Sequence, residues 1–329
     1  MRLGGPAKFL VTVGSEDELA EAVQWARDKD LPLRMIGSGA NIVFGDEGYP
    51  GLIIVNKILG HDEVASDKDS VTFKVGGGEI WDEFVALTVS QNLSGIETLS
   101  LIPGTVGAAP VQNIGAYGQQ ISDNIVELRA FDLEQNHLVT LKPEECDFSY
   151  RASRFNRQDK GKFLIASVSI KLSKKPTVAP PYYADVAAFL EEHEIIKPTI
   201  SQIRQAVIAI RTRKLPDPRT VANCGSFFYN PLVSPEVFTK LSKKYPDLRS
   251  HQTDDGQLKL YAGQLIEIAG FKGIHDPETG MAIWPKQALV LVNEAASTTA
   301  DLLKFKSKIT DKVHDLFGVT LEQEPELFT

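Results

Sequence analysis

The sequence has few cysteines and no long apolar run. Its 329 residues include only Cys146 and Cys224, which lie far apart, so we expect free thiols rather than a disulfide. No stretch is long and apolar enough to cross a bilayer. Met1 leads into RLGGPAKF without the apolar segment of a signal peptide. We therefore expect a cytoplasmic protein without membrane contact.

The sequence also lacks an excess of positive charge and has few histidines. The formal net charge is −8, which argues against general nucleic-acid binding. The six histidines show no metal-ligand spacing and stand outside the motifs below, which argues against a metal site and against a serine hydrolase. One cationic cluster, Arg211-Thr-Arg-Lys214, suits either a local anion pocket or compensation of a helix dipole.

What stands out is the uncharged stretch Leu101–Gly118, LIPGTVGAAPVQNIGAYG. Its four glycines and two prolines break any long helix or strand. Glycine lets main-chain N–H groups approach a phosphate or a flat ring without a Cβ in the way. A tight turn between two elements explains the same composition, so both interpretations stay open.

A second glycine-rich turn, Gly37-Ser-Gly-Ala-Asn41, follows an expected strand at Leu31–Ile36. It resembles a dinucleotide fingerprint, but Ile42 stands at the third glycine position and no helix pattern follows, which argues against a Rossmann site. Backbone N–H groups of this turn could hold phosphate, or it could be a plain turn. A third glycine turn, Gly76–Gly78, ends the expected strand from Ser70.

Periodicity predicts the other elements. Capping boxes at Ser15–Glu18 and Thr199–Gln202 predict helices, and apolar alternation on both sides of residues 134–136 predicts a hairpin. The proline-rich segment Lys174–Tyr183 cannot be a helix interior and predicts a linker or a loop over a site. The tail Val319–Pro325 predicts a short strand that the proline ends.

Two polar motifs are candidates for chemistry. Phe148-Ser-Tyr-Arg151 sets an arginine beside a tyrosine, which alone indicates a surface cation on an aromatic ring. Asn223–Pro231, NCGSFFYNP, fits neither a helix face nor an alternating strand. Its serine has no histidine base, but a serine can donate a proton where the resulting alkoxide is stabilised.

Together these motifs resemble the UDP-N-acetylenolpyruvoylglucosamine reductase (MurB) family. GSGANIVF, IPGTVGAAPVQNIGAYG, YRASRF, RTRKLPDP, NCGSFFYNP and LEQEP occur in the family's order over nearly the whole chain. The resemblance implies an α+β fold: an FAD-binding fold of the vanillyl-alcohol-oxidase type with two α+β subdomains, and a separate α+β substrate-binding domain. We expect the first subdomain at 1–57, joined by a C-terminal strand at 318–329, the second at 58–175, a linker or lid loop at 176–198, and the substrate domain at 199–317.

The resemblance also implies the activity, in which NADPH and FAD reduce the enolpyruvyl group of a UDP-sugar in peptidoglycan precursor synthesis. Ser226 matches the proton donor to C2, and Arg151 and Glu324 match the pair that supports the enolate. The implied partner is the small-molecule substrate alone, with no nucleic acid, and we expect a monomer.

The resemblance implies two further sets of site residues. FAD contacts would come from Gly37, Ser38, Gly39, Ala40, Asn41, Pro103, Gly104, Thr105, Gly107, Ala108, Gln112, Gly115, Ala116 and Tyr117. Substrate contacts would come from Tyr150, Tyr183, Lys214, Asn230 and Gln287, with Tyr183 in the lid loop.

The chain departs from the family pattern at two positions: Tyr229 stands where lysine is frequent, and Pro325 stands where better-known members have valine. Two alternatives stay open. An FAD-linked oxidase of the same fold would share the glycine turns but would not need the Gly-Ser-Phe-Phe segment or Glu324. A non-catalytic nucleotide-sugar binder would not need Arg151, Ser226 and Glu324 together.

Overall fold

The chain forms two compact units in the computed structural model, which describes residues 1–175, 180–253 and 256–329. The N-terminal unit comprises Ala7–Ala40 and Pro50–Arg211. The C-terminal unit comprises Met1–Pro6, Asn41–Tyr49 and Thr212–Thr329. Residues 176–179, part of the proline-rich segment expected to be a linker or lid, lie outside the described residues. The expected division into two FAD subdomains, a linker and a substrate domain stays a prediction.

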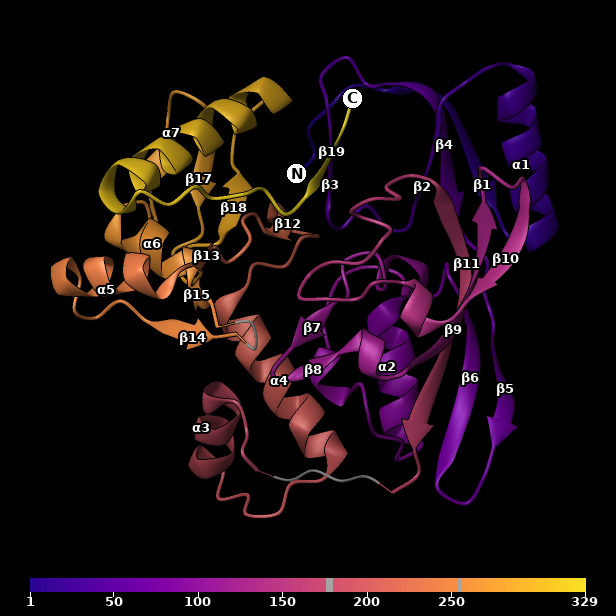
Figure 1. Ribbon diagram of the computed structural model, residues 1–329, viewed down its shortest axis with the longest axis horizontal. Coiled ribbons are helices and arrows are strands. Elements are labelled where there is room, and N and C mark those ends of the chain that lie inside the picture. The colour runs from indigo at the N-terminus through magenta and orange to yellow at the C-terminus, as the bar shows by residue number, and fades with distance from the viewer. Residues whose placement is uncertain (176–179, 254–255) are drawn as a thin grey trace. The chain divides into compact units, whose positions relative to one another are not determined.

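A three-stranded sheet with the strand order β1-β4-β2 opens the N-terminal unit (Figure 1). Its elements are β1 (Ala7–Val13), α1 (Glu16–Asp28), β2 (Leu33–Ile36) and β4 (Tyr49–Asn56). Apolar positions of α1, among them Leu19 and Val23, pack in one core with Leu52 and Ile54 of β4. Only half of the predicted capping box forms: Ser15 Oγ accepts from Glu18 N–H at 3.1 Å, but the Glu18 carboxylate accepts from Gly14 N–H.

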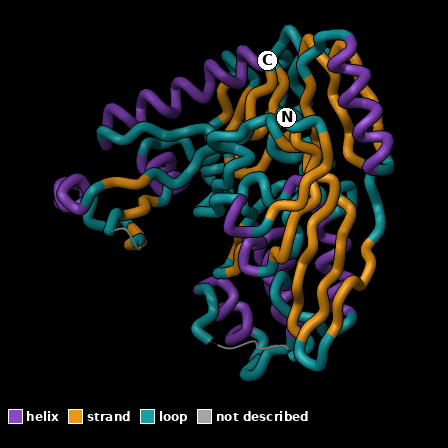
Figure 2. The backbone as a smooth tube through the Cα atoms, turned by 45° about the vertical axis from the view of Figure 1, so that its right-hand side comes forward, coloured by secondary structure: helices purple, strands orange, loops and turns teal. Residues whose placement is uncertain are grey.

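The largest sheet of the N-terminal unit is antiparallel, with the order β10-β9-β11-β6-β5, and its long strands run together in Figure 2. The strands are β5 (His61–Ser66), β6 (Ser70–Gly76), β9 (Ile125–Asp132), β10 (His137–Leu141) and β11 (Phe163–Ser173). The predicted hairpin is confirmed, because His137 pairs with Asp132. Helix α2 (Trp81–Ser90) buries Trp81 and Phe84 in the same core as Phe73 and Val75.

Short elements and two helices complete the N-terminal unit. The short elements are η1 (Glu97–Leu99), η2 (Val106–Ala108), β7 (Gly115–Ala116), β8 (Gln119–Gln120), η3 (Ile121–Asp123) and η4 (Pro143–Glu145). Helix α3 (Ala184–Glu192), which the sequence analysis missed, packs Val186 and Leu190 against α4 (Ile200–Lys214). The capping box of α4 is confirmed, since Gln202 N–H donates to Thr199 Oγ1 and Gln202 Oε1 accepts from Thr199 N–H.

The described residues of the C-terminal unit form two antiparallel sheets and three helices, besides the strand pair at the chain end. One sheet has the order β12-β18-β17-β16 and the other β13-β15-β14. The elements are β12 (Ala222–Ser226), β13 (Leu232–Val233), α5 (Pro235–Lys244), β14 (Ser250–Gln252), β15 (Leu258–Leu260), α6 (Ala262–Ile268), β16 (His275–Asp276), β17 (Met281–Ile283), β18 (Val290–Asn293) and α7 (Thr299–Phe317). Helix α7 lies against β17, where its Leu302 and Phe305 share a core with Met281 (Figure 1).

The chain end corrects one expectation. The strand predicted at Val319–Pro325 was wrong: the strand β19 (Glu326–Phe328) begins after the proline and pairs in parallel with β3 (Ile42–Phe44). Proline has no N–H to donate to a ladder, whereas Glu326 N–H donates to Asn41 O at 3.0 Å. The ladder can therefore start only past Pro325.

Helix α7 ends at Gly318 in the left-handed conformation, with φ of +64°, and Gly318 N–H donates to His314 O. The site has open space for a Cβ, so Gly318→Ala adds only backbone strain. We expect the free energy of unfolding to fall by ~1 kcal/mol, read from the urea midpoint. The matched control Ser307→Ala, at an exposed position of the same helix, should not lower it. Equal midpoints for the two variants would contradict the cap.

Candidate active site

Gly37, directly after β2, lies against Thr105 of the central stretch. A Cβ on Gly37 would stand 2.1 Å from Thr105 Oγ1, so only glycine fits there. Thr105 is 2% exposed, and its hydroxyl has no hydrogen-bond partner among the residues that the structure describes. An orphaned buried hydroxyl costs free energy unless a ligand pairs with it. The geometry therefore indicates a ligand-binding position between these two turns.

The stretch Leu101–Gly118 runs along the third glycine turn. Val106 N–H donates to Glu79 O and Gly107 N–H donates to Gly77 O, both at 2.9 Å. A Cβ on Gly107 would stand 2.9 Å from Gly77 Cα, so the two backbones touch without side chains between them. The turn at Gly76–Gly78 thus supports the central stretch.

Two glycines of the stretch leave open space beside the backbone. Gly104, at φ of +137°, and Gly118, at φ of +89°, would each place a Cβ more than 4 Å from any heavy atom outside their chain neighbours. Their role is conformational, because both adopt φ values that L side chains rarely reach. Open backbone at these points is accessible to a ligand.

Arg151 is bound to the same stretch. Its Nη2 donates to Gly115 O at 2.5 Å, and its guanidinium carbon lies 5.2 Å from the ring centroid of Tyr150. The contact with an aromatic ring expected from the sequence is therefore present together with a contact to the central stretch. Asn113, 1% exposed, supports this region by donating to Ser149 O and accepting from Ser122 N–H.

Tyr117 and Tyr183 meet edge to face, with ring centroids 5.9 Å apart. Burial raises the pKa of the Tyr117 hydroxyl, and the charge of Arg211 opposes that rise. Arg211 Nε donates to Leu101 O at 3.3 Å. Tyr183, the residue expected in the lid loop, thus contacts the stretch Leu101–Gly118 within the N-terminal unit.

In the C-terminal unit, strand register brings Ser226 close to Glu324. Ser226 ends β12 and pairs with Val290, after a bulge at Gly225 with φ of +78°. The next residue, Phe227, accepts at its carbonyl from Glu324 N–H at 2.9 Å. Glu324, an expected catalytic residue, therefore pairs with the residue that directly follows Ser226, although the two are far apart in sequence.

The buried thiol of Cys224 lies in this region of β12. The pKa of Cys224 is raised to about 12, chiefly by burial; the positive charge of the N-terminus opposes this rise and the nearby Glu324 carboxyl group adds to it. Cys224 is therefore a neutral thiol at physiological pH and a poor nucleophile. Both Cys224 and Cys146 are free, as the sequence predicted.

The remaining expected substrate residues of the C-terminal unit are held by backbone contacts. Asn230 Oδ1 accepts from Ala262 N–H at 2.9 Å, at the start of α6. Gln287 Oε1 accepts from Leu289 N–H. Gln287 itself stands three residues before Val290, which pairs with Ser226. The carbonyl of Lys214 accepts from Trp284 Nε1 at 3.0 Å. Gln287 therefore lies by the same strand pair as Ser226.

Family models match both parts of the chain. The model described as "FAD binding domain" matches residues 7–142, and the model described as "UDP-N-acetylenolpyruvoylglucosamine reductase, C-terminal domain" matches residues 217–328. The UDP-N-acetylenolpyruvoylglucosamine reductase of Cupriavidus pinatubonensis is 41% identical over 97% of this chain and 93% of its own length. That of Pseudomonas aeruginosa is 39% identical over 98% and 94%. This chain belongs to the UDP-N-acetylenolpyruvoylglucosamine reductase family.

Solved structures agree on the fold. The reductase (MurB) from Thermus caldophilus is similar with a TM-score of 0.68 and 23% identity, covering 99% of this chain and 94% of that one. The expected α+β fold with an FAD-binding part is therefore confirmed. No helix of the described ranges is long and apolar enough to cross a membrane. Within 1–175, 180–253 and 256–329, no group of histidine, cysteine and acidic residues could hold a metal ion.

FAD, the cofactor of this flavoenzyme family, fits the N-terminal unit. The orphaned Thr105 hydroxyl, the glycine-only contact at Gly37 and the open backbone at Gly104 suit a ligand that needs hydrogen-bond partners and close backbone approach. Gly37, Ser38, Gly39 and Ala40 belong to this unit, and Asn41 to the other. The individual cofactor contacts stay a proposal.

A methyl group at residue 37 tests the FAD position. In Gly37→Ala the new Cβ collides with the Thr105 hydroxyl, so we expect purified protein to lose most of its flavin absorbance. Gly14→Ala is the matched control, since its Cβ would meet nothing closer than 3.5 Å in the turn after β1. Full flavin content in Gly37→Ala would contradict an FAD site at this turn.

Proposed function

We propose that this chain reduces the enolpyruvyl group of UDP-N-acetylglucosamine enolpyruvate, with NADPH as reductant and FAD as mediator, to give UDP-N-acetylmuramate for peptidoglycan synthesis. Family membership over nearly the full chain supports the activity. The observation that carries the residue assignment is the backbone bond of Glu324 to Phe227, which sets Glu324 beside Ser226. The proposal includes a monomeric enzyme in the cytoplasm.

The reaction adds a hydride to C3 of the enolpyruvyl group and a proton to C2, which turns the C=C bond into a saturated CH3–CH unit. The hydride would come from FAD when it is bound, with NADPH as the reductant of the flavin. The chain must then supply the proton and stabilise the negative charge that develops beside the substrate carboxylate. Ser226 is the proposed proton donor to C2.

Arg151 and Glu324 are the proposed stabilisers of the enolate. The Arg151 guanidinium can bind a carboxylate with two parallel N–H groups. Its attachment to Gly115 O orients it next to the stretch that is proposed to line the flavin. A carboxyl group at Glu324 helps most when it is protonated and donates a hydrogen bond to the developing charge.

Each of the five proposed substrate residues has a defined contact within the structure. Gln287 stands by the strand pair of Ser226, and Asn230 and Lys214 are fixed by bonds to α6 and Trp284. Tyr150 stacks on Arg151, and Tyr183 contacts Tyr117. Lys214 and the arginines of the same motif provide positive charge for the anionic nucleotide sugar, although the whole chain is acidic.

Replacement of the Ser226 hydroxyl should separate the two half-reactions. We expect Ser226→Ala to be bleached by NADPH at the wild-type rate, because flavin reduction does not use this hydroxyl. Reoxidation by the enolpyruvyl substrate should slow by ~10²–10⁴-fold, the usual contribution of a positioned proton donor. Stopped-flow flavin absorbance measures both steps. Ser242→Ala, at a partly buried position of α5 outside the proposed site, is the control. An unchanged reoxidation rate in Ser226→Ala would refute the role.

Two replacements test the protonation of Glu324. Glutamine can still donate a hydrogen bond to the enolate, whereas alanine cannot, so Glu324→Gln should retain more turnover than Glu324→Ala. The ratio of the two kcat values in steady-state assays is the measurement. Equal losses would show that hydrogen-bond donation by this side chain is not what the reaction needs.

A further inference from the structure

Leu101, the first residue of the central stretch, is held in a conformation that leucine rarely adopts. Its φ is +60°. Its N–H donates to Asp82 Oδ1 at 2.6 Å, and its carbonyl accepts from Arg211 Nε at 3.3 Å. Such a backbone persists only where the surroundings fix it on both sides. The stretch proposed to line the flavin therefore begins at a point that two charged side chains hold.

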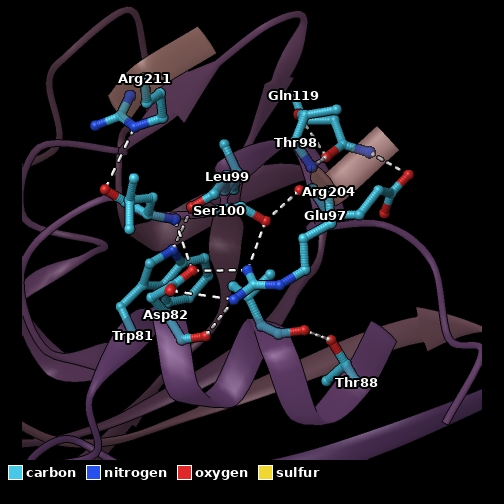
Figure 3. A network of polar contacts seen from close by, with 12 residues as sticks. Trp81, Asp82, Thr88, Glu97, Thr98, Leu99, Ser100, Gln119, Arg204 and Arg211 are labelled. Carbon is cyan, nitrogen blue, oxygen red and sulfur yellow. Dashed lines mark hydrogen bonds and ion pairs between the residues drawn. The ribbon is translucent and has the colours of Figure 1, made fainter. Parts of the chain in front are cut away.

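Asp82 is itself clamped by Arg204 of α4 (Figure 3). Arg204 Nη1 donates to Asp82 Oδ1 at 2.7 Å and Nη2 to Oδ2 at 3.1 Å. Nη1 also donates to Ser100 Oγ at 2.7 Å, and Ser100 is fully buried. The Arg204 and Asp82 side chains are only 14% and 27% exposed, so water competes weakly for this pair.

The charge on Asp82 persists at neutral pH. Burial disfavours the ionised carboxyl, but hydrogen bonds from Arg204 and from Leu101 N–H outweigh it and hold the pKa of Asp82 below its usual value. The Arg204 fork therefore faces a carboxylate under physiological conditions. The pair therefore contacts the Ser100 side chain and the Leu101 backbone at the same time.

The neighbour of Asp82 reaches the flavin-lining residues directly. Trp81 Nε1 donates to Leu99 O at 2.9 Å, and Trp81 N–H donates to Gly104 O at 3.1 Å. Trp81 is 1% exposed. The first turn of α2 thus bonds to residues 99, 101 and 104, so its position sets the position of Gly104 and of the Thr105 hydroxyl beyond it.

Helix α4 supplies both arginines. Arg204 and Arg211 are seven residues apart, which is about two helical turns, so they lie on one face of the helix. That face reaches Ser100 and Leu101. A carboxylate in the first turn of a helix is common and by itself has only a structural role. Such a role does not explain why Asp82 also binds the Arg204 guanidinium and the strained backbone of Leu101.

We propose that Asp82 and Arg204 are positioning residues for the flavin, acting through the backbone of Leu101–Gly104. The proposal rests on the proposed function only in taking this stretch as the FAD contact. Neither side chain needs to touch FAD or substrate. Loss of the pair should let the stretch relax and misplace the Thr105 hydroxyl.

The test compares Asp82→Asn, Arg204→Gln and the double variant with wild type, using FAD titration of the apoprotein. Asparagine can still accept from Leu101 N–H but cannot attract the Arg204 fork. We expect the Kd for FAD to rise by about tenfold or more in each single variant, the usual loss for a charged hydrogen bond. The double variant should bind FAD no more weakly than the weaker-binding single variant, because the two single variants and the double variant all lack the same ion pair.

A second readout separates positioning from structure. The visible band of bound flavin should change shape in both single variants, because its surroundings move. Glu16→Gln is the matched control: Glu16 pairs with Arg129 at 3.5 Å, is 29% exposed, and contacts no residue of the central stretch in that pair. It should leave the Kd and the band unchanged while affecting apoprotein melting.

The proposal fails if the variants lower apoprotein Tm yet keep the FAD Kd within about twofold of wild type with an unchanged band. If Asp82→Asn does not fold, Arg204→Lys decides, because it keeps the charge but not the fork. An unchanged Kd in Arg204→Lys together with Arg204→Gln refutes the role. None of these readouts uses the enolpyruvyl substrate, so a failure of the proposed reaction shows separately, as wild-type reduced flavin that the substrate does not reoxidise.

Discussion

Close approach at glycines, which leaves no room for a Cβ, is the constraint on which the N-terminal unit depends. A Cβ on Gly37 would stand 2.1 Å from the Thr105 side-chain hydroxyl, and a Cβ on Gly107 would stand 2.9 Å from the backbone of Gly77. Three turns that are separate in sequence thereby become one surface rich in main-chain groups. A cofactor with phosphates and a flat ring needs such a surface, because side chains would hold it at a distance. The glycines at 37, 77 and 107 therefore suit the close approach that we propose for FAD.

The C-terminal unit differs in that it holds the side chains proposed for the reaction, Ser226 and Glu324, at fixed positions. The Gly-Ser-Phe-Phe motif looked odd in sequence because it serves two purposes. Phe227 and Phe228 are fully buried and pack edge to face at 5.2 Å, which anchors the end of β12 in the core. Ser226, one residue earlier, follows the bulge at Gly225, and the pairing of Phe227 with Glu324 sets the distant carboxylate beside it. Rigid anchoring and reactivity therefore come from adjacent residues.

Local signals in the sequence predicted what local contacts determine. The capping box of α4 and the hairpin turn at residues 134–136 both formed, since each depends on residues a few positions apart. Helix α3 was missed because its short apolar face gains stability only against α4. The clamp of Asp82 by Arg204 carries no local signal, because its partners are far apart in the chain and charged residues on helices are ordinary. The family motifs indicated the candidate site residues but not the network beneath them.

The two units should therefore differ in what they tolerate. In the proposed cofactor surface, the essential property of Gly37 or Gly107 is the absence of a Cβ, so any substitution should harm it, whatever its chemistry. At Ser226 and Glu324 the proposed essential property is the functional group, so its removal should slow the reaction while the strands keep their register. Leu101 falls between these cases, because its side chain is replaceable but its backbone conformation is not. A conformation of that kind has to be imposed from outside the segment, and the charged pair between α2 and α4 supplies that force.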